Sequence, residues 1–332
     1  MSQTCSMKHT TESSPPLTAR FAGVFYSLNI VMILLAVFHF QGLLVDGNAF
    51  ELGKDHWTGT WATAPQHFLP SRLQTLHDQT VRLIVHISVG GKKLRVRISN
   101  TYGTNQLLIG DAHVARRTTG AEIDETSDRS LTFNGRRALA IPAGSTAVSD
   151  AVDMDMPALS DLAVSIYFPG STEVTTWHSL ALQTNYVSAE NVKATSRAKF
   201  PTDKTITTCP FLTGMDVDAP YGAYSIVAFG ASLTDGDGST KDTNGRWPDV
   251  LAERLQKDAD RNKELGILNE GIIGNRLLHD YHSLRQSGGP PPLGPVYEQL
   301  GPVLGESGVT RFERDVLAQP GVKYVILGLG VK

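Results

Sequence analysis

Hydrophobic residues in the first half of the chain alternate with polar ones at a period of two. This alternation is clearest over 81–87 and 94–98, with a glycine pair between the two runs, and it recurs over 162–168. Two such runs around a glycine pair predict a β-hairpin with one buried face. Several short strands with frequent turns over 57–215 predict one N-terminal β-sandwich or jelly-roll-like domain.

The pattern changes after 203–222, which we interpret as a linker because it is rich in proline and glycine. The predicted elements beyond it are strands at 224–229, 267–268 and 322–329, a helix from Trp247, and a helix over 309–319 with Phe312, Val316 and Leu317 on one face. Alternating β and α elements predict an α/β domain over 221–332 with a parallel, flavodoxin-like sheet. The last apolar strand is expected to be buried.

The N-terminal region has a different character. A polar stretch ends at Arg20, and Phe21 to Val45 is then almost wholly apolar. Such a run is typical of an export signal or a membrane anchor, so residues 1–49 are interpreted as one or the other. Small residues up to Ala49 fit signal cleavage, whereas the length of the run fits an uncleaved anchor. In both cases the domains are expected outside the cytoplasm, either secreted, periplasmic or membrane-anchored.

Composition narrows the function classes. With 332 residues, 41% hydrophobic and 19% charged, the chain has room for two domains. A net charge of −3 argues against a nucleic-acid partner. The chain contains two cysteines, Cys5 and Cys209, and its histidines His86 and His178 have no second ligand at metal spacing nearby. We therefore expect no disulfide framework and no metal site.

Two groups of side chains in the β domain have alternative interpretations. Four aromatic residues either belong to its core or form a platform on which a sugar ring stacks: Trp57, Trp61, Trp177 and Tyr186. Arg95 and Arg97 lie on the outer face of their predicted strand, where we expect them to be solvated.

Ser232 follows the strand 224–229, whose end is marked by Gly230. It is therefore expected on the loop at the carboxyl end of a strand, where open α/β sheets place their chemistry. A serine hydroxyl becomes a nucleophile when it is exposed on a tight turn and a base takes its proton. By spacing alone a plain structural turn is the favoured interpretation, because Gly-x-Ser loops are common.

The C-terminal residues carry a family resemblance. Three stretches in order resemble conserved blocks of the SGNH, or GDSL-type, hydrolases: Gly230 to Gly236, Asn269 to Gly274, and Arg311 to Leu317 followed by Val325 to Gly330. The stretches Trp57 to Pro65 and Arg97 to Asn100 resemble the β domain that precedes the hydrolase domain in one secreted bacterial subfamily.

This resemblance implies a serine esterase. It gives Ser232 as the nucleophile, with the backbone N–H groups of Ser232 and Gly274 as donors of the oxyanion hole. The implied substrate is a small-molecule, lipid or carbohydrate ester, and no metal or organic cofactor is implied.

The sequence departs from the family pattern in three places. Lys332 stands where the family has an asparagine donor, Ala231 stands where it usually has aspartate, and the Asp-x-x-His block that supplies the base is missing. His279 and His282 are expected to be surface residues. We therefore expect an incomplete, C-terminally truncated hydrolase domain with an unpaired sheet edge and lost activity. The alternative is a carbohydrate-binding or adhesion β module with an inert hydrolase remnant.

Overall fold

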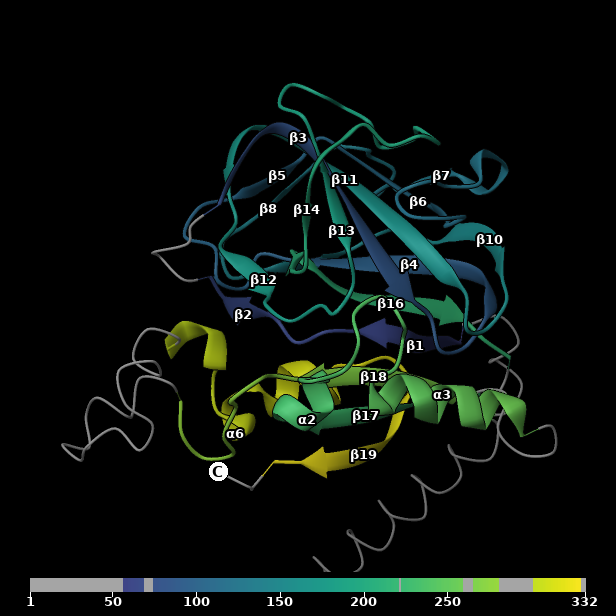
Figure 1. The fold of residues 1–332 in the computed structure, drawn as a ribbon, viewed down its shortest axis with the longest axis vertical. Coiled ribbons are helices and arrows are strands. Elements are labelled where there is room, and N and C mark those ends of the chain that lie inside the picture. Colours follow the sequence, from purple (N-terminus) through teal and green to yellow (C-terminus); the bar gives the residue numbers. More distant parts are fainter. Residues whose placement is uncertain (1–55, 69–73, 221, 259–264, 281–300, 330–332) are drawn as a thin grey trace, which may run out of the picture. The chain divides into compact units, whose positions relative to one another are not determined.

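The structure is a computed structural model that describes residues 56–68, 74–220, 222–258, 265–280 and 301–329. These residues are mostly β-strand with few helices, and the chain from His56 onward forms one compact unit (Figure 1). The predicted export or anchor segment, with its apolar run from Phe21 to Val45, lies outside the described residues. No described helix has the length and apolar character needed to cross a membrane.

Two antiparallel sheets make up most of the N-terminal part. One has the order β1-β16-β4-β10, with β9 also paired to β4: β1 (Trp57–Ala62), β16 (Leu212–Asp218), β4 (Gly91–Ser99), β10 (Val152–Met156) and β9 (Thr146–Val148). The other has the order β14-β13-β3-β11-β6-β7: β14 (Thr202–Ile206), β13 (Asn185–Ser188), β3 (Thr75–His86), β11 (Asp161–Glu173), β6 (Asp111–Arg116) and β7 (Arg129–Ser130). Smaller elements are β15 (Cys209–Pro210), β12 (Thr176–His178), β2 (Gln66–His67), β5 (Leu107–Ile109), β8 (Leu139–Ile141) and η4 (Glu125–Ser127).

The two large sheets share one hydrophobic core. Leu83 and Val85 of β3, and Val96 and Ile98 of β4, are each at most 1% exposed. Fully burying such a side chain stabilises the fold by about 1.5–3 kcal/mol. The alternation in the sequence thus identifies the residues that face this core.

The predicted hairpin of 81–87 and 94–98 is wrong. β3 pairs with β11 and β13, whereas β4 pairs with β16, β10 and β9, so the two strands lie in different sheets. A Cβ on Gly90 would lie 2.4 Å from the carbonyl oxygen of Met156, so the glycine allows the two backbones to approach closely.

Both faces of β3 are buried. On the face that carries Arg82 and Ile84, these side chains are 0% and 4% exposed.

The predicted linker at 203–222 is also wrong. It contains most of β14 and all of β15 and β16, and β16 lies between β1 and β4 within a sheet. Proline and glycine residues here belong to short strands and the turns that join them. The N-terminal β region therefore runs to Asp218, three residues beyond the predicted boundary at 215.

Arg95 and Arg97 are paired, contrary to the expectation that they are solvated. Arg95 Nε lies 2.9 Å from Asp216 Oδ2, and Arg97 Nη2 lies 3.1 Å from Asp216 Oδ1. The side chain of Asp216 is 2% exposed. A carboxylate that is this buried needs cationic partners, and β16 places it directly beside both arginines.

The aromatic residues fit the core interpretation better than the platform. Trp177 is 6% exposed, and its ring centroid lies 4.2 Å from that of Phe68. Trp57, Trp61 and Tyr186 are half-buried and lie on β1 and β13, so these side chains form no exposed row.

The C-terminal part contains a parallel sheet of order β18-β17-β19: β18 (Leu265–Gly271), β17 (Tyr224–Gly230) and β19 (Val322–Gly328). Its helical elements are α2 (Ser232–Asp235), α3 (Trp247–Lys257), η5 (Gly301–Leu304), α6 (Gly308–Phe312) and the π-helical turn η6 (Glu313–Leu317). The predicted strand at 224–229 and the helix start at Trp247, with Pro248 in the first turn, are confirmed.

The predicted helix over 309–319 is shorter than expected and divides into α6 and η6. Val316 is fully buried and Phe312 packs beside it, as predicted. Leu317, by contrast, is 61% exposed. The π-helical turn places more residues in each turn than an α-helix does, so it rotates the face away from the helical spacing assumed from sequence.

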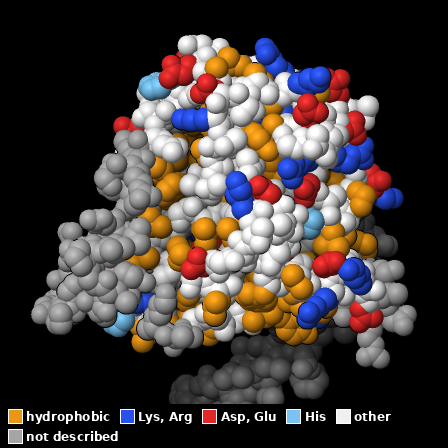
Figure 2. Space-filling model, in the orientation of Figure 1, with side chains coloured by type: hydrophobic (Ala, Val, Ile, Leu, Met, Phe, Trp, Pro, Cys, Tyr) orange, Lys and Arg blue, Asp and Glu red, His pale blue; other side chains and the backbone are white. Residues whose placement is uncertain are grey.

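The last strand is parallel as predicted, but it is not buried. β19 pairs with β17 and, among the described residues, has no strand on its other side. Tyr324 is 51% exposed and Leu327 is 57% exposed. Hydrophobic side chains gather along the lower edge of the molecule in Figure 2, where β19 lies in Figure 1. An apolar strand with an open edge promotes association between chains.

Replacing Leu327 with lysine is expected to reduce association while changing the free energy of unfolding by no more than about 0.5 kcal/mol, because this side chain is exposed. Light scattering over a concentration series measures the effect. Val309→Lys is the matched control, since Val309 is 61% exposed but lies on a helix. If both substitutions reduced association equally, general surface hydrophobicity and not the strand edge would be its cause.

The two parts are joined through buried polar contacts. Ser225 Oγ of β17 donates to the carbonyl of Gly59 in β1 at 3.1 Å, and the Ile267 N–H of β18 donates to Ser88 Oγ at 2.8 Å. A Cβ on Gly266 would lie 1.9 Å from the carbonyl oxygen of Gly59, so β1 and β18 touch backbone to backbone (Figure 1).

Candidate active site

Ser232 occupies the first turn of α2, directly beyond the carboxyl end of β17. Only Ala231 separates it from Gly230, the last residue of the strand. A Cβ on Gly230 would lie 2.0 Å from Thr234 Oγ1, so the tight turn into α2 requires glycine there. Ser232 is half-buried, and its Oγ makes no hydrogen bond to another described residue. The serine therefore lies at the predicted edge of the sheet, at the start of a short helix.

Gly274 lies in a turn directly after β18. The Asn275 N–H donates to the Ile272 carbonyl at 3.0 Å, and Gly274, at φ +74°, occupies the left-handed region that favours glycine. A Cβ at this position would lie 2.4 Å from Leu304 Cδ2. The backbone conformation therefore favours glycine at the position that the family resemblance assigns to the oxyanion hole, and a Cβ there would also require the Leu304 side chain to move.

Direct hydrogen bonds hold these two turns together. The Ile273 N–H, adjacent to Gly274, donates to Asp235 Oδ2 at 2.6 Å, and Asn269 Nδ2 donates to the carbonyl of Thr234 at 2.8 Å. The Ile272 N–H also donates to the carbonyl of Gly230 at 3.1 Å. The structure thus places the Ser232 turn and the Gly274 turn side by side at the carboxyl edge of the parallel sheet.

Sequence reasoning missed the histidine that supports this arrangement. His178, at the end of β12, is 3% exposed, and Asp235, three residues after Ser232, is 1% exposed. His178 Nε2 lies 3.0 Å from Asp235 Oδ1, and His178 Nδ1 lies 2.8 Å from the carbonyl oxygen of Ala64. The sequence offers His178 only as a candidate metal ligand, because nothing in it links this histidine to a residue 57 positions later.

The hydrogen bonds of His178 and Asp235 limit how many protons the two side chains hold together. A carbonyl oxygen only accepts hydrogen bonds, so His178 Nδ1 donates to Ala64. The Nε2 contact with Asp235 then requires either an imidazolium facing a carboxylate or a neutral ring facing a protonated carboxyl. Both arrangements hold the same number of protons and occupy both ring nitrogens. His178 is therefore suited to positioning Asp235 and is not free to take a proton from a serine.

Arg311 donates hydrogen bonds to the carboxyl ends of both strands. It is fully buried, and its guanidinium donates to the carbonyls of Gly230 at 3.1 Å and Glu270 at 2.8 Å. It also donates to Asn275 Oδ1 at 3.1 Å and to Asp315 Oδ2 at 3.0 Å. One side chain of α6 thus binds backbone next to the Ser232 turn and next to the Gly274 turn.

Burial shifts the pKa of Arg311 and of the neighbouring Glu270. Burial lowers the pKa of the Arg311 guanidinium, although the nearby Asp315 opposes this effect. Burial raises the pKa of the Glu270 carboxyl well above its usual value, and the charge of Asp315 raises it further. Glu270 Oε1 accepts a hydrogen bond from Gln319 Nε2 at 2.8 Å, whereas Oε2 has no hydrogen-bond partner among the described residues.

The remaining candidates lie away from this site or outside the described residues. His279 is exposed, and His282 and Lys332 are not described. His86 Nδ1 lies 2.7 Å from Asp161 Oδ1. Cys209 is buried, and burial raises the pKa of its thiol to about 12. Across the described ranges no three His, Cys, Asp or Glu side chains are grouped to hold a metal ion.

Comparison with known proteins identifies the C-terminal part. Residues 226–331 match the family described as GDSL-like Lipase/Acylhydrolase. The match contains Ser232, Gly274, Arg311 and Asp315, and it confirms the resemblance to SGNH, or GDSL-type, hydrolases. Residues 226–331 therefore carry the sequence pattern of this hydrolase family.

Comparisons with curated proteins and with solved structures do not identify the fold or the substrate. A search of curated proteins gave no match. Among solved structures, the chain is similar to a carbohydrate esterase family 2 enzyme plus carbohydrate binding domain from Corynascus thermopiles (Myceliophthora fergusii), at 14% identity and a TM-score of 0.22. The alignment covers 78% of this chain and 65% of that chain. A superposition this loose supports no conclusion about fold or substrate.

Proposed function

We propose that this protein is a carboxylic ester hydrolase that uses Ser232 as its nucleophile. The observation that carries the proposal is the pairing of two turns on neighbouring parallel strands. One presents Ser232, the other presents Gly274 at positive φ, and the Asp235 carboxyl ties them through the Ile273 N–H. A reacting carbonyl between the turns meets a hydroxyl and backbone donors together.

The proposed reaction has two steps. Ser232 Oγ bonds to the ester carbonyl carbon as its proton passes to solvent water, and collapse of the tetrahedral intermediate breaks the bond to the leaving oxygen, which takes a proton from water and departs as the alcohol. Water then attacks the acyl-serine, releases the acid and restores the hydroxyl. The N–H groups of Ser232 and Gly274 would stabilise the oxyanion, each by about 3 kcal/mol.

The described residues do not provide a general base to take the proton of Ser232. Both nitrogens of His178 are occupied, His279 is exposed, and the Asp-x-x-His block does not occur in the sequence. We therefore propose that the 332-residue chain by itself hydrolyses esters only weakly. A serine site without its base retains about 10³-fold acceleration over water from binding and oxyanion stabilisation.

The proposal also includes the domain organisation, the location outside the cytoplasm and the substrate class. We propose a β-sandwich domain followed by a flavodoxin-like hydrolase domain, supported by the shared core of the two antiparallel sheets and by the parallel order β18-β17-β19. The apolar run from Phe21 to Val45 supports export or anchoring, with both domains outside the cytoplasm. An acylated carbohydrate or a lipid is the proposed substrate class.

Hydrolysis of p-nitrophenyl acetate tests the proposal. Wild-type protein is expected to release p-nitrophenol faster than buffer, and Ser232→Ala is expected to return the rate to the buffer value, because the attacking oxygen is gone. Ser239→Ala is the matched control, since Ser239 is a half-buried serine on the same loop beyond α2. Hydrolysis that survives in Ser232→Ala would contradict the proposal.

A further inference from the structure

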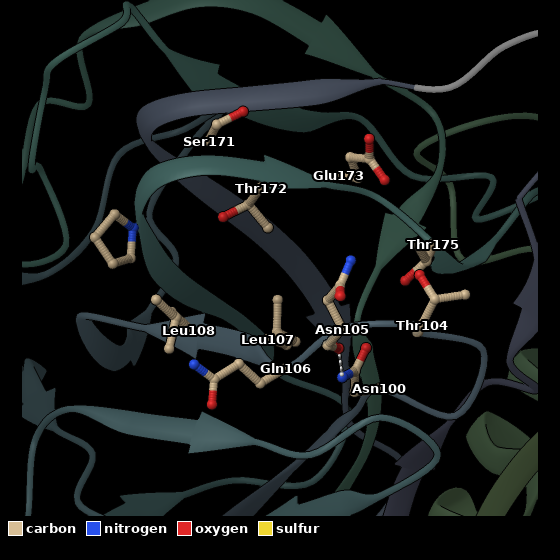
Figure 3. A pocket seen from close by; sticks show the side chains of 12 residues that line it. Asn100, Thr104, Asn105, Gln106, Leu107, Leu108, Ser171, Thr172, Glu173 and Thr175 are labelled. Carbon is tan, nitrogen blue, oxygen red and sulfur yellow. Dashed lines mark hydrogen bonds between the residues drawn. The ribbon is translucent and has the colours of Figure 1, made fainter.

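A hollow of about 290 Å³ opens on the β region, away from the Ser232 turn. Its two sides are the loop from Asn100 into β5 and the second half of β11 with the residues that follow it (Figure 3). This volume is at the lower end of the range for small-molecule sites, about 300–1,000 Å³. It therefore suits a compact ligand.

The loop side of the hollow is preorganised. Asn100 is 2% exposed, and its Nδ2 donates to the carbonyl of Asn105 at 2.9 Å and to that of Ile141 at 3.1 Å. A Cβ on Gly103 would lie 1.9 Å from Asn100 Oδ1, so the loop folds closely over this amide. The buried amide fixes the backbone and leaves the side chains at the loop tip free, and a fixed loop loses little entropy on binding.

The strand side is shaped by a bulge. The register of β11 against β3 shifts between Phe168 and Ser171. Gly170, at φ +66°, donates its N–H to Asp78 Oδ1 at 2.8 Å. Bulges of this kind bend a strand and redirect its side chains. Here Ser171 and Glu173 line the hollow opposite the loop (Figure 3).

The side chains around the hollow are mostly uncharged and polar. They are amides, hydroxyls, one carboxylate and a few apolar groups: Thr104, Asn105, Gln106, Ser171, Thr172, Thr175, Glu173, Leu107, Leu108 and Pro169. Among the residues that the structure describes, neither Lys nor Arg lines it, and neither does an aromatic ring. Among the described residues, the amides of Asn105 and Gln106 and the carboxylate of Glu173 make no hydrogen bond. These groups are thus available to a ligand.

We propose that this hollow binds a neutral saccharide. Sugar hydroxyls both donate and accept hydrogen bonds, which amides and hydroxyls can match, and a carboxylate can accept from two neighbouring hydroxyls. Leu108, 41% exposed, offers an apolar surface for the C–H face of a sugar ring. The described lining residues carry no cation, and this disfavours phosphate, sulfate and other anions. This site is not the aromatic platform considered from the sequence.

The saccharide site shares no lining residue with the hydrolase site. Its lining comes from the β4–β5 loop, β5, β11 and Thr175, and it contains neither Ser232 nor Gly274. Saccharide binding is therefore expected to persist in Ser232→Ala, which separates this inference from the proposed esterase activity.

Ligand-observed NMR with the full chain tests the inference, using glucose, galactose, mannose and N-acetylglucosamine as probes and glucose 6-phosphate as the charged comparison. At least one neutral sugar is expected to bind, and the charged sugar is expected to bind no more tightly than glucose. The double variant Asn105→Ala/Glu173→Gln is expected to weaken binding at least tenfold. Both side chains are exposed and unbonded, so the fold should be retained, and circular dichroism verifies this.

The matched control is Glu122→Gln, which changes an exposed glutamate outside the hollow and should leave binding unchanged. Ser171→Trp provides a second variant, because a large side chain in the hollow should block the sugar. The inference is overturned if no neutral sugar binds, or if Asn105→Ala/Glu173→Gln and Ser171→Trp both bind as the wild type does. Loss of binding in Ser232→Ala would place the sugar in the hydrolase site and would also overturn it.

Discussion

Replacing Arg311 with methionine is expected to lower the free energy of unfolding by about 3–5 kcal/mol, the usual cost of removing one member of a buried, hydrogen-bonded ion pair. Arg311 is fully buried, and its guanidinium carbon lies 4.0 Å from the centroid of the Phe229 ring. Methionine fills much of the same space but donates no hydrogen bond. The carbonyls of Gly230 and Glu270 would lose their donor, and an unpaired buried polar group costs about 1–3 kcal/mol.

Denaturant titration of the wild type and Arg311→Met measures this change. Arg254→Met is the matched control, because Arg254 is an exposed arginine on α3 and its loss should change the free energy of unfolding by no more than about 0.5 kcal/mol. Since Arg311 holds the ends of both β17 and β18, ester hydrolysis should fall as well. An Arg311→Met protein as stable as the control would show that these hydrogen bonds do not support the sheet edge.

Replacing His178 with alanine is expected to cost a similar amount, about 3–5 kcal/mol, and to reduce ester hydrolysis at least tenfold. Alanine leaves the buried Asp235 carboxyl with the Ile273 N–H but without the imidazole. The Asp235 side chain is then less firmly held, and with it the turn that contains Gly274. Because oxyanion donors act mainly on the transition state, kcat should fall more than KM rises.

Thermal unfolding and p-nitrophenyl acetate kinetics together test this prediction. His178→Gln should recover part of both losses, since a glutamine amide can still donate to Asp235. His279→Ala is the control, because His279 is an exposed histidine in the segment after Gly274. If His178→Ala lowered stability but left kcat unchanged, the pair would be structural only. If His279→Ala alone abolished hydrolysis, the expectation that His279 is a surface residue without a role would be wrong.

Local sequence predicts some features of the candidate site and not others. The strand that ends at Gly230 and the turn at Ser232 follow from the sequence, because each is defined by a few adjacent residues and by a glycine in a tight turn. Gly274 was assigned through the family resemblance. His178 and Arg311 were not assigned roles at this site. Their partners are as much as 114 residues away in sequence, and a buried polar group does not reveal its partner by its own spacing.

The sequence by itself determined which residues of 81–87 and 94–98 face a core, where β17 and α3 begin, and which family the residues from 226 to 331 match. These features depend on short-range periodicity, on turn residues and on motifs. Only the tertiary structure decided that β3 pairs with β11 rather than β4, that 203–222 contributes strands, and that β19 is exposed. Alternation specifies the face of a strand but not its neighbour, and an apolar run has the same sequence in a buried strand and at an open edge.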